Sequence, residues 1–231
     1  MRNSIRRGAE KTVIYSSKNL RPDGLDNRFR ERRFEFFARI VSETLKKNQS
    51  CRILDLGGSA EYWSRYGKGL DWTRVTVCSV NRTAAPVKMP GFEAMAGDAR
   101  RLDQFADNSF DIVHSNSVIE HVGKWDDMVA MAEEVRRLAP RYFVQTPYFW
   151  FPIEPHARFI FFHWLPESWR YRIILRRRCG FWERQPDVGK AVKQVQSACM
   201  IDKRQMHFLF PDADISFERF MGFPKSIIAV R

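Results

Sequence analysis

The chain has 231 residues, of which 44% are apolar and 29% charged, and its net charge is +12. This composition is typical of globular proteins and excludes a low-complexity or disordered chain. Arg, Pro or Glu breaks every apolar stretch well before the roughly 18 residues that a membrane-spanning helix needs. Since no apolar segment follows the charges after Met1, we expect a cytoplasmic α/β protein without a secretory signal.

Cysteine and histidine spacing points to no metal site. The four cysteines have no C-x-x-C pair, and the five histidines have no H-E-x-x-H spacing. Free thiols in a reducing compartment are the simplest interpretation. We therefore predict that the protein needs no metal.

Positive charge is concentrated in two segments of the chain. Residues 1–47 carry 13 basic and 6 acidic residues, and residues 157–205 carry 11 basic and 4 acidic residues. Two solvated helical faces would explain this pattern. Alternatively, both segments border one site and meet nucleic acid, a nucleotide-sugar or an anionic membrane surface.

The N-terminal part predicts an irregular arm followed by one helix. Residues 1–25 show little periodicity, whereas apolar residues recur at helical spacing from about Arg28 to Lys47. Asp26 or Asn27 is expected to cap this amphipathic helix. The basic arm and the helix together make up a first unit, residues 1–47.

Short apolar strands alternate with helices in the rest of the chain. This alternation predicts βαβ units and a Rossmann-like, doubly wound, mainly parallel sheet of seven strands. Two closely spaced runs near the C-terminus should form an antiparallel hairpin. Strands are expected at 51–57, 75–80, within 91–97, 110–114, 141–146, 213–220 and 225–231, with a helix from Asp126 or Asp127 to about Leu138.

Residues 147–205 interrupt the strand pattern and are rich in proline, aromatic residues and arginine. We expect them to form a cap over the carboxyl ends of the strands, where open α/β sheets bind ligands. The second unit is therefore residues 48–231, with the cap inserted into it.

The sharpest motif is Ile53-Leu54-Asp55-Leu56-Gly57-Gly58-Ser59-Ala60. Glycines after a strand let a ligand approach the backbone, and a following helix N-terminus attracts an anion. The G-x-G-x-x-G spacing of dinucleotide enzymes is absent, since the next glycine is Gly67. Asp55 would repel a pyrophosphate but attract an amine, so the predicted ligand carries an amino group and a carboxylate.

With this loop the sequence resembles the class I S-adenosylmethionine-dependent methyltransferases. Asn81 stands where that family usually has Asp or Glu for the ribose hydroxyls, and Gly97-Asp98-Ala99 resembles its adenine-binding segment. The run 110–122 resembles its fourth strand and the following loop. Asp55, Asn81, Asp98 and Asp111 lie 26, 17 and 13 residues apart.

The resemblance covers residues 48–146 by motif and the terminal hairpin by architecture. It implies S-adenosylmethionine as the cofactor. The residues that it implies as cofactor contacts are Asp55, Gly57, Gly58, Ser59, Asn81, Asp98, Ala99, Ser115 and Asn116. For Asp111, at the start of a strand, a structural hydrogen bond is the favoured interpretation.

Two histidines are candidates for the acceptor chemistry. A hydroxyl acceptor needs a base with a pKa near neutrality, which histidine supplies. His121 follows the fourth strand and His156 follows the fifth, so both should face the carboxyl edge of the sheet. Glu154 could orient His156. For either histidine the alternative is a structural hydrogen bond.

The aromatic run from Pro147 to Pro166 resembles bacterial class I methyltransferases found with surface-polysaccharide biosynthesis. This resemblance implies O-methylation of a sugar or glycan hydroxyl, nucleotide- or lipid-linked. The alternative is an aromatic cap that only packs over the sheet. The five arginines within 170–178 could contact an anionic membrane, clamp phosphates or be solvated.

The expected partner is therefore an anionic small molecule or glycan. Peripheral contact with the inner face of the membrane, through residues 158–178, is a second expectation, and nucleic acid is less favoured. An RNA methyltransferase remains an alternative, although Ser115-Asn116-Ser117-Val118 replaces the Asn-Pro-Pro-Tyr motif. A non-catalytic cofactor-binding homologue is a second alternative, and a nucleotide-dependent dehydrogenase is a less favoured one. The sequence leaves the oligomeric state open.

Overall fold

The computed structural model describes residues 24–84 and 86–231. The irregular arm expected at residues 1–25 therefore lies almost entirely outside the described residues. Among the described residues, no helix has both the length and the apolar character to cross a membrane.

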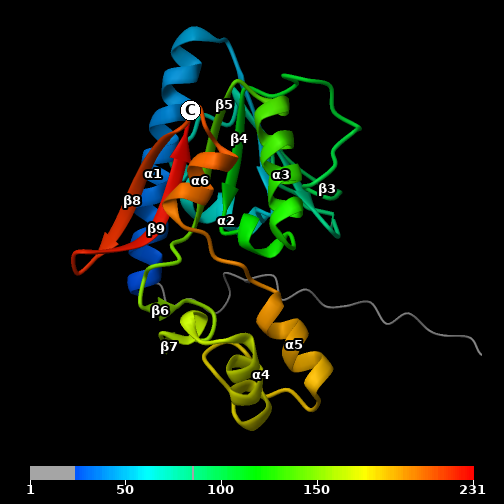
Figure 1. Cartoon of the computed structure of the whole chain (residues 1–231). Helices are drawn as coiled ribbons and strands as arrows, with labels where there is room; N and C mark the ends of the chain where they lie inside the picture. Colours follow the sequence, from blue (N-terminus) through cyan, green and yellow to red (C-terminus); the bar gives the residue numbers. More distant parts are fainter. Residues whose placement is uncertain (1–23, 85) are drawn as a thin grey trace, which may run out of the picture.

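A seven-stranded sheet forms the centre of the protein, in the order β3-β2-β1-β4-β5-β9-β8 (Figure 1). The first five strands in this order are parallel, whereas β9 pairs antiparallel with β5 and β8 antiparallel with β9. This confirms the predicted Rossmann-like sheet and its terminal hairpin. The strands are β1 (Cys51–Leu56), β2 (Val75–Asn81), β3 (Phe92–Ala96), β4 (Ile112–Asn116), β5 (Arg141–Pro147), β8 (Asp214–Phe220) and β9 (Phe223–Val230).

Helices cover both faces of the sheet, which is why the central strands are apolar along their whole length. On one face, α1 (Leu25–Lys47) and α2 (Ala60–Tyr66) pack an aromatic core that includes Phe37 and Trp63. On the other face, α3 (Trp125–Leu138) and α6 (Lys203–Leu209) pack a mainly aliphatic core. The two layers hold the carboxyl ends of the parallel strands at one edge.

Two predicted element starts differ from the structure. Helix α1 begins at Leu25 after Gly24 and has no side-chain cap, so the expected cap at Asp26 or Asn27 is wrong. Both side chains have tertiary partners instead: Asp26 meets Arg158 and Lys225, and Asn27 accepts a hydrogen bond from the Tyr66 hydroxyl. Strand β4 begins at Ile112, because the Asp111 carboxylate accepts hydrogen bonds from the backbone of Arg52 and from Asn48. The structural role favoured for Asp111 is thus confirmed.

The inserted segment forms a lobe beyond the carboxyl edge of the sheet (Figure 1). It contains β6 (Ile153–Glu154), β7 (Phe159–Ile160), α4 (Glu167–Arg176) and α5 (Val188–Gln196). Phe162, Ile174 and Trp182 belong to a separate small core within the lobe. The lobe therefore has its own hydrophobic support and can form a wall over the strand ends.

Candidate functional site

A cavity of about 1160 Å³ lies between the carboxyl edge of the sheet and the cap. Its walls come from α1, the loops after β1, β2 and β4, the cap, and the β8–β9 hairpin. This volume is slightly above the range of about 300–1,000 Å³ that is typical of ligand sites, so a cofactor and an acceptor can be held together.

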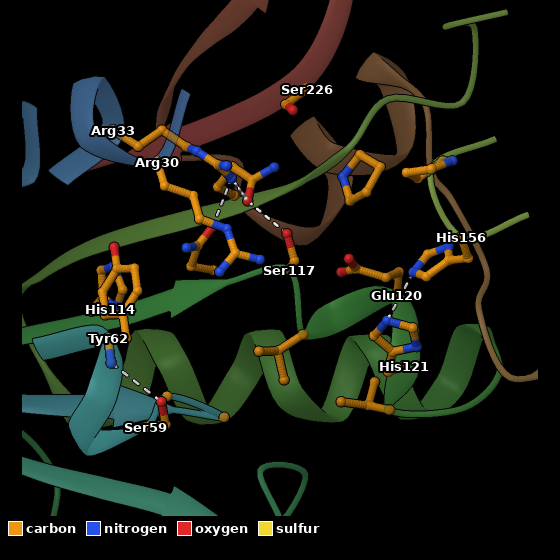
Figure 2. Close-up of a pocket in the computed structure, with 18 of the residues that line it drawn as sticks. Arg30, Arg33, Ser59, Tyr62, His114, Ser117, Glu120, His121, His156 and Ser226 are labelled. Carbon is orange, nitrogen blue, oxygen red and sulfur yellow. Dashed lines mark hydrogen bonds between the residues drawn. The ribbon is translucent and has the colours of Figure 1, made fainter. Parts of the chain in front are cut away.

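The predicted glycine loop forms one wall of this cavity. Gly57 has φ +76°, and a Cβ atom there would lie 2.5 Å from a methyl group of Val118. Only glycine satisfies both constraints. Ser59 caps α2 by accepting a hydrogen bond from the backbone N–H of Tyr62 at 3.3 Å (Figure 2). The loop thus presents its backbone to the cavity at the start of a helix.

Asp55 lies beneath this loop and is fully buried. Its Oδ1 is 2.8 Å from Nδ1 of His114, and its Oδ2 accepts a hydrogen bond from the Trp63 indole at 2.5 Å. The carboxylate also belongs to the cavity wall. Asp55 therefore connects the hydrophobic core to the cavity. Its contact with a cofactor amine stays a prediction.

Asn81, at the end of β2, braces the loop from the other side. Its Nδ2 donates to the carbonyl of Gly58 at 2.8 Å and to Oγ of Ser79 at 3.1 Å. Since the amide nitrogen is used in this way, Oδ1 is the atom with which Asn81 can accept a bond from a ribose hydroxyl.

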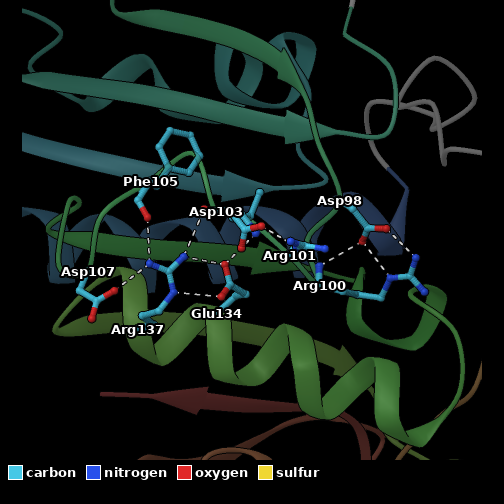
Figure 3. Close-up of polar contacts among 9 residues, drawn as sticks. Asp98, Arg100, Arg101, Asp103, Phe105, Asp107, Glu134 and Arg137 are labelled. Carbon is cyan, nitrogen blue, oxygen red and sulfur yellow. Dashed lines mark hydrogen bonds and ion pairs between the residues drawn. The ribbon is translucent and has the colours of Figure 1, made fainter.

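Asp98 and Ala99 line the cavity beyond β3. Arg100 binds the Asp98 carboxylate through two nitrogens, at 2.9 and 2.5 Å (Figure 3). It also reaches Asp127 at 2.6 Å. The Arg100 hydrogen bonds hold the pKa of Asp98 below its usual range. A carboxylate has about four acceptor positions, so Asp98 can still accept from an adenine amino group.

The two predicted contacts on β4 differ in their position. Asn116 lines the cavity and accepts a hydrogen bond from Arg33 at 2.8 Å. Ser115 is fully buried within the sheet and does not line this cavity. The structure therefore does not bring Ser115 together with the other predicted residues.

Sequence reasoning missed Arg30, which projects from α1 into the cavity (Figure 2). Burial and the neighbouring guanidinium of Arg33 lower the pKa of Arg30. Arg30 makes no ion pair with another residue of the described part of the chain, whereas Arg33 meets Glu218 at 3.3 Å. A half-buried cation without an ion pair among the described residues suits an anionic group such as a carboxylate. No motif marks Arg30, because it lies within an ordinary amphipathic helix.

The two predicted histidines meet at the opposite end of the cavity (Figure 2). Nε2 of His121 lies 3.1 Å from Nε2 of His156. Nδ1 of His156 is 2.6 Å from Glu154, as the sequence suggested, and Nδ1 of His121 is 2.7 Å from the carbonyl of Ser197. His156 is only 3% exposed and stacks on Trp182. Both rings are therefore fixed in orientation.

Glu120 is a second residue that sequence reasoning missed. It is 1% exposed, lines the cavity beside the histidine pair and accepts a hydrogen bond from Thr146 through Oε2 at 2.9 Å. Its other oxygen, Oε1, has no hydrogen-bond partner among the described residues. The position directly before His121 was the only signal in the sequence.

Residues 54–141 match the model of a protein family described as a methyltransferase domain. The matched segment contains the glycine loop, Asn81, Asp98 and the loop after β4. No curated protein matches the chain.

Solved structures resemble this chain at low sequence identity. A protein of Pyrococcus horikoshii OT3 is 17% identical, with a TM-score of 0.51, over 90% of this chain and 92% of that one. A SAM-dependent methyltransferase from Methanosarcina mazei is 14% identical, with a TM-score of 0.47, over 79% of this chain and 92% of that one. At 17% identity, the Pyrococcus protein shows the fold alone.

The fold and the matched segment define the class of the protein as a Rossmann-like methyltransferase. Residues 54–141 match a methyltransferase domain, which supports an S-adenosylmethionine-dependent methyltransferase with S-adenosylmethionine as its cofactor. The cavity fits this cofactor: the glycine loop leaves its backbone open, and acceptors at Asn81 and Asp98 lie along the same wall.

Proposed function

We propose that the enzyme methylates a hydroxyl of a sugar or glycan that is nucleotide- or lipid-linked. The observation that carries this proposal is the His121–His156 pair. The pair lies in the same cavity as the glycine loop but at its far end, beside the cap. A hydroxyl must lose its proton to a base as it attacks a methyl group. Amine and thiol acceptors depend less on such a base.

The proposed roles follow from the contacts of the pair. S-adenosylmethionine supplies a methyl group on a positively charged sulfur, which is already a good leaving group. His156 is the proposed residue that takes the hydroxyl proton, because Glu154 holds its ring in one orientation. His121 is the alternative. His156 is 3% exposed and stacks on Trp182, which supports a role for the cap in keeping water away from this ring.

The cap side of the cavity also supports an anionic acceptor. Phe151 and Phe181 provide apolar wall there, while Arg158 and Lys225 provide positive charge. The guanidinium of Arg158 lies 4.3 Å from the centroid of the Phe181 ring, so apolar surface and positive charge are adjacent in this wall. A sugar carrying a phosphate presents one apolar and one anionic part to such a wall.

The test is transfer of labelled methyl groups to nucleotide-sugars, lipid-linked glycans and RNA. We expect transfer to a glycan fraction, and about a 10²-fold or greater loss of turnover in His156→Gln with unchanged cofactor affinity. His207→Gln is the matched control, since His207 lies on α6, is exposed and does not line the cavity. Transfer only to RNA, with a steep salt dependence, would overturn the proposal. Cofactor binding without transfer to any fraction would do so too.

We also propose that the cap contacts an anionic lipid surface. Trp169, Arg172 and Arg176 are exposed on α4 at spacings of three and four, so they share one helix face. Trp169 is 61% exposed. A face that combines an exposed tryptophan with arginines is typical of helices that lie on membranes.

Co-sedimentation with phosphatidylglycerol vesicles tests this contact. We expect binding that phosphatidylcholine vesicles do not support and that Arg172→Glu with Arg176→Glu abolishes. The double variant Lys68→Glu with Arg101→Glu is the control, because it changes the net charge equally at exposed sites outside the cap. Equal loss in both double variants would show only a general charge effect and contradict the proposal.

A further inference from the structure

The hydrogen bonds of the histidine pair fix the state of both rings. The carbonyl of Ser197 can only accept, so Nδ1 of His121 carries a proton. Glu154 accepts from the backbone N–H of Ala157 through Oε2 and faces Nδ1 of His156 through Oε1, so Nδ1 is the ring nitrogen that donates to it. In the neutral form, both Nε2 atoms therefore carry lone pairs.

These two lone pairs face each other across 3.1 Å. Such an arrangement is repulsive unless a cation lies between the two nitrogens, either as a proton on one ring or as a metal ion. Two nitrogens at about 2.0–2.1 Å from one tetrahedral ion lie roughly 3.3 Å apart. The rings are nearly perpendicular, with an interplanar angle of 82°, as two ligands converging on one ion can be.

Glu120 distinguishes a metal ion from a proton. Its Oε1 is buried and has no hydrogen-bond partner among the described residues. Ligand atoms of Glu120, His121 and His156 all lie within 4.8 Å of one another. A shared proton would satisfy the two nitrogens and leave this oxygen without a partner. A metal ion would satisfy all three groups.

We infer that Glu120, His121 and His156 form a binding site for one divalent first-row transition-metal ion of the zinc type. Two imidazoles and one carboxylate are ligands that such ions prefer over magnesium. The partners of the two Nδ1 atoms, Glu154 and the Ser197 carbonyl, are those that orient metal-bound histidines elsewhere. All three ligands line the cavity, so a further coordination position is open to the acceptor.

The metal site itself does not depend on the proposed function. Only the catalytic role of the metal ion rests on that function, which it refines. A hydroxyl bound to such an ion would have a lowered pKa, and its proton would be released when the acceptor binds. The histidines would then activate the acceptor as ligands rather than as a free base. An acceptor with two adjacent hydroxyls, such as a sugar diol, suits this arrangement.

From the sequence we expected no metal, because Glu120, His121 and His156 show no metal-ligand spacing. His121 and Glu120 come from the loop after β4, and His156 comes from the cap 35 residues later. No short spacing marks such a site, because the topology of the sheet brings the two segments together.

The test is metal binding by the full chain, measured without an acceptor. Protein stripped with a chelator is titrated with Zn²⁺ by calorimetry, and with Co²⁺ by absorption spectroscopy. We expect one ion per chain and a Co²⁺ spectrum of a four- or five-coordinate site. Glu120→Gln, His121→Ala and His156→Ala should each weaken binding about tenfold or more. His207→Ala, exposed on α6, should bind as the parent does.

The metal-free melting temperature of each variant separates loss of ligand from loss of fold. Saturating Zn²⁺ should raise the melting temperature of the parent and of His207→Ala, and much less that of the three ligand variants. Absence of binding in the parent, or binding that Glu120→Gln and His156→Ala leave intact, would overturn the inference. If Zn²⁺ binds as expected but no glycan is methylated, the metal site stands and the proposed acceptor is wrong.

Discussion

Gly58 and Asp55 are so close that a Cβ atom at position 58 would lie 1.5 Å from Oδ2 of Asp55. The same oxygen accepts the hydrogen bond from Trp63, whose side chain is fully buried in the core. The acid, the glycine and the tryptophan therefore behave as one packed unit. This unit couples the backbone of the cofactor loop to the hydrophobic core.

Gly58→Ala should consequently weaken S-adenosylmethionine binding by about tenfold or more and lower the melting temperature. The added methyl group must displace a buried carboxylate, and overpacking of this kind costs roughly 1–3 kcal/mol. Calorimetry and thermal unfolding measure the two effects. Gly69→Ala is the matched control, because nothing lies within 4 Å of a Cβ atom there. Equal behaviour of the two variants would contradict the packing argument.

Asp55→Asn tests the charge of the same group while keeping its shape. The amide can still accept one hydrogen bond, from either Trp63 or His114, so one buried partner loses its acceptor. A loss of about 1–3 kcal/mol in the free energy of unfolding is expected. If the carboxylate also meets the cofactor amine, Asp55→Asn should weaken the binding of S-adenosylmethionine much more than the binding of an analogue that lacks the amino group. A similar loss for both ligands would restrict Asp55 to a structural role.

Patterns along one strand and its loop made much of this architecture predictable. Asp55, Gly57 and Gly58 are adjacent in sequence, and the conformation they require is local. The mainly parallel sheet and the hairpin also followed from spacing, because two strands joined by a connection too short for a helix pair antiparallel. The start of α1 was not predictable in this way, since Asp26 and Asn27 are good caps by type but find partners far away in sequence.

The missed site residues share one property: their neighbours in space are distant in the chain. Arg30 lies in an amphipathic helix whose charged positions all look alike, and only packing shows that it faces the cavity. Glu120 looks like any loop acid until Oε1 is seen to be buried without a partner. Ser115 is the opposite case: it was predicted as a cofactor contact but is buried within the sheet. Its position after Asn81 and Asp98 in the motif order did not reveal this burial.

Arg30→Met should weaken S-adenosylmethionine binding about tenfold while leaving the affinity for 5′-methylthioadenosine, which has no carboxylate, nearly unchanged. The reason is that Arg30 is a half-buried guanidinium of the cavity wall without an ion pair among the described residues, whereas Arg33 meets Glu218. Arg28→Met, an exposed position on the same helix, is the control. Equal weakening of both ligands by Arg30→Met would show that Arg30 shapes the cavity without binding the carboxylate.

Arg100→Met should destabilise the protein by less than about 1 kcal/mol at pH 7, because the Asp98–Arg100 pair is partly exposed. Arg100 lowers the pKa of Asp98, so its contribution is present above the unfolded pKa of Asp98, about 3.9. The contribution is lost as the pH falls through the lower folded value. The difference in unfolding free energy between parent and variant, measured by denaturant titration, should therefore shrink below about pH 3.9. A difference that grew on acidification would contradict this assignment.

Asn81→Asp introduces a residue that the family usually has at this position, yet we expect it to weaken cofactor binding several-fold. The amide nitrogen of Asn81 donates to the Gly58 carbonyl at 2.8 Å, and a carboxylate would place an acceptor against that oxygen. The loop would then lose one of its supports, although Ser79 also donates to the same carbonyl at 2.9 Å. Calorimetry with S-adenosylmethionine measures the effect, and Asn81→Ala separates loss of the donor from repulsion. Tighter binding by Asn81→Asp would show that charge facing the ribose matters more here than support of the glycine loop.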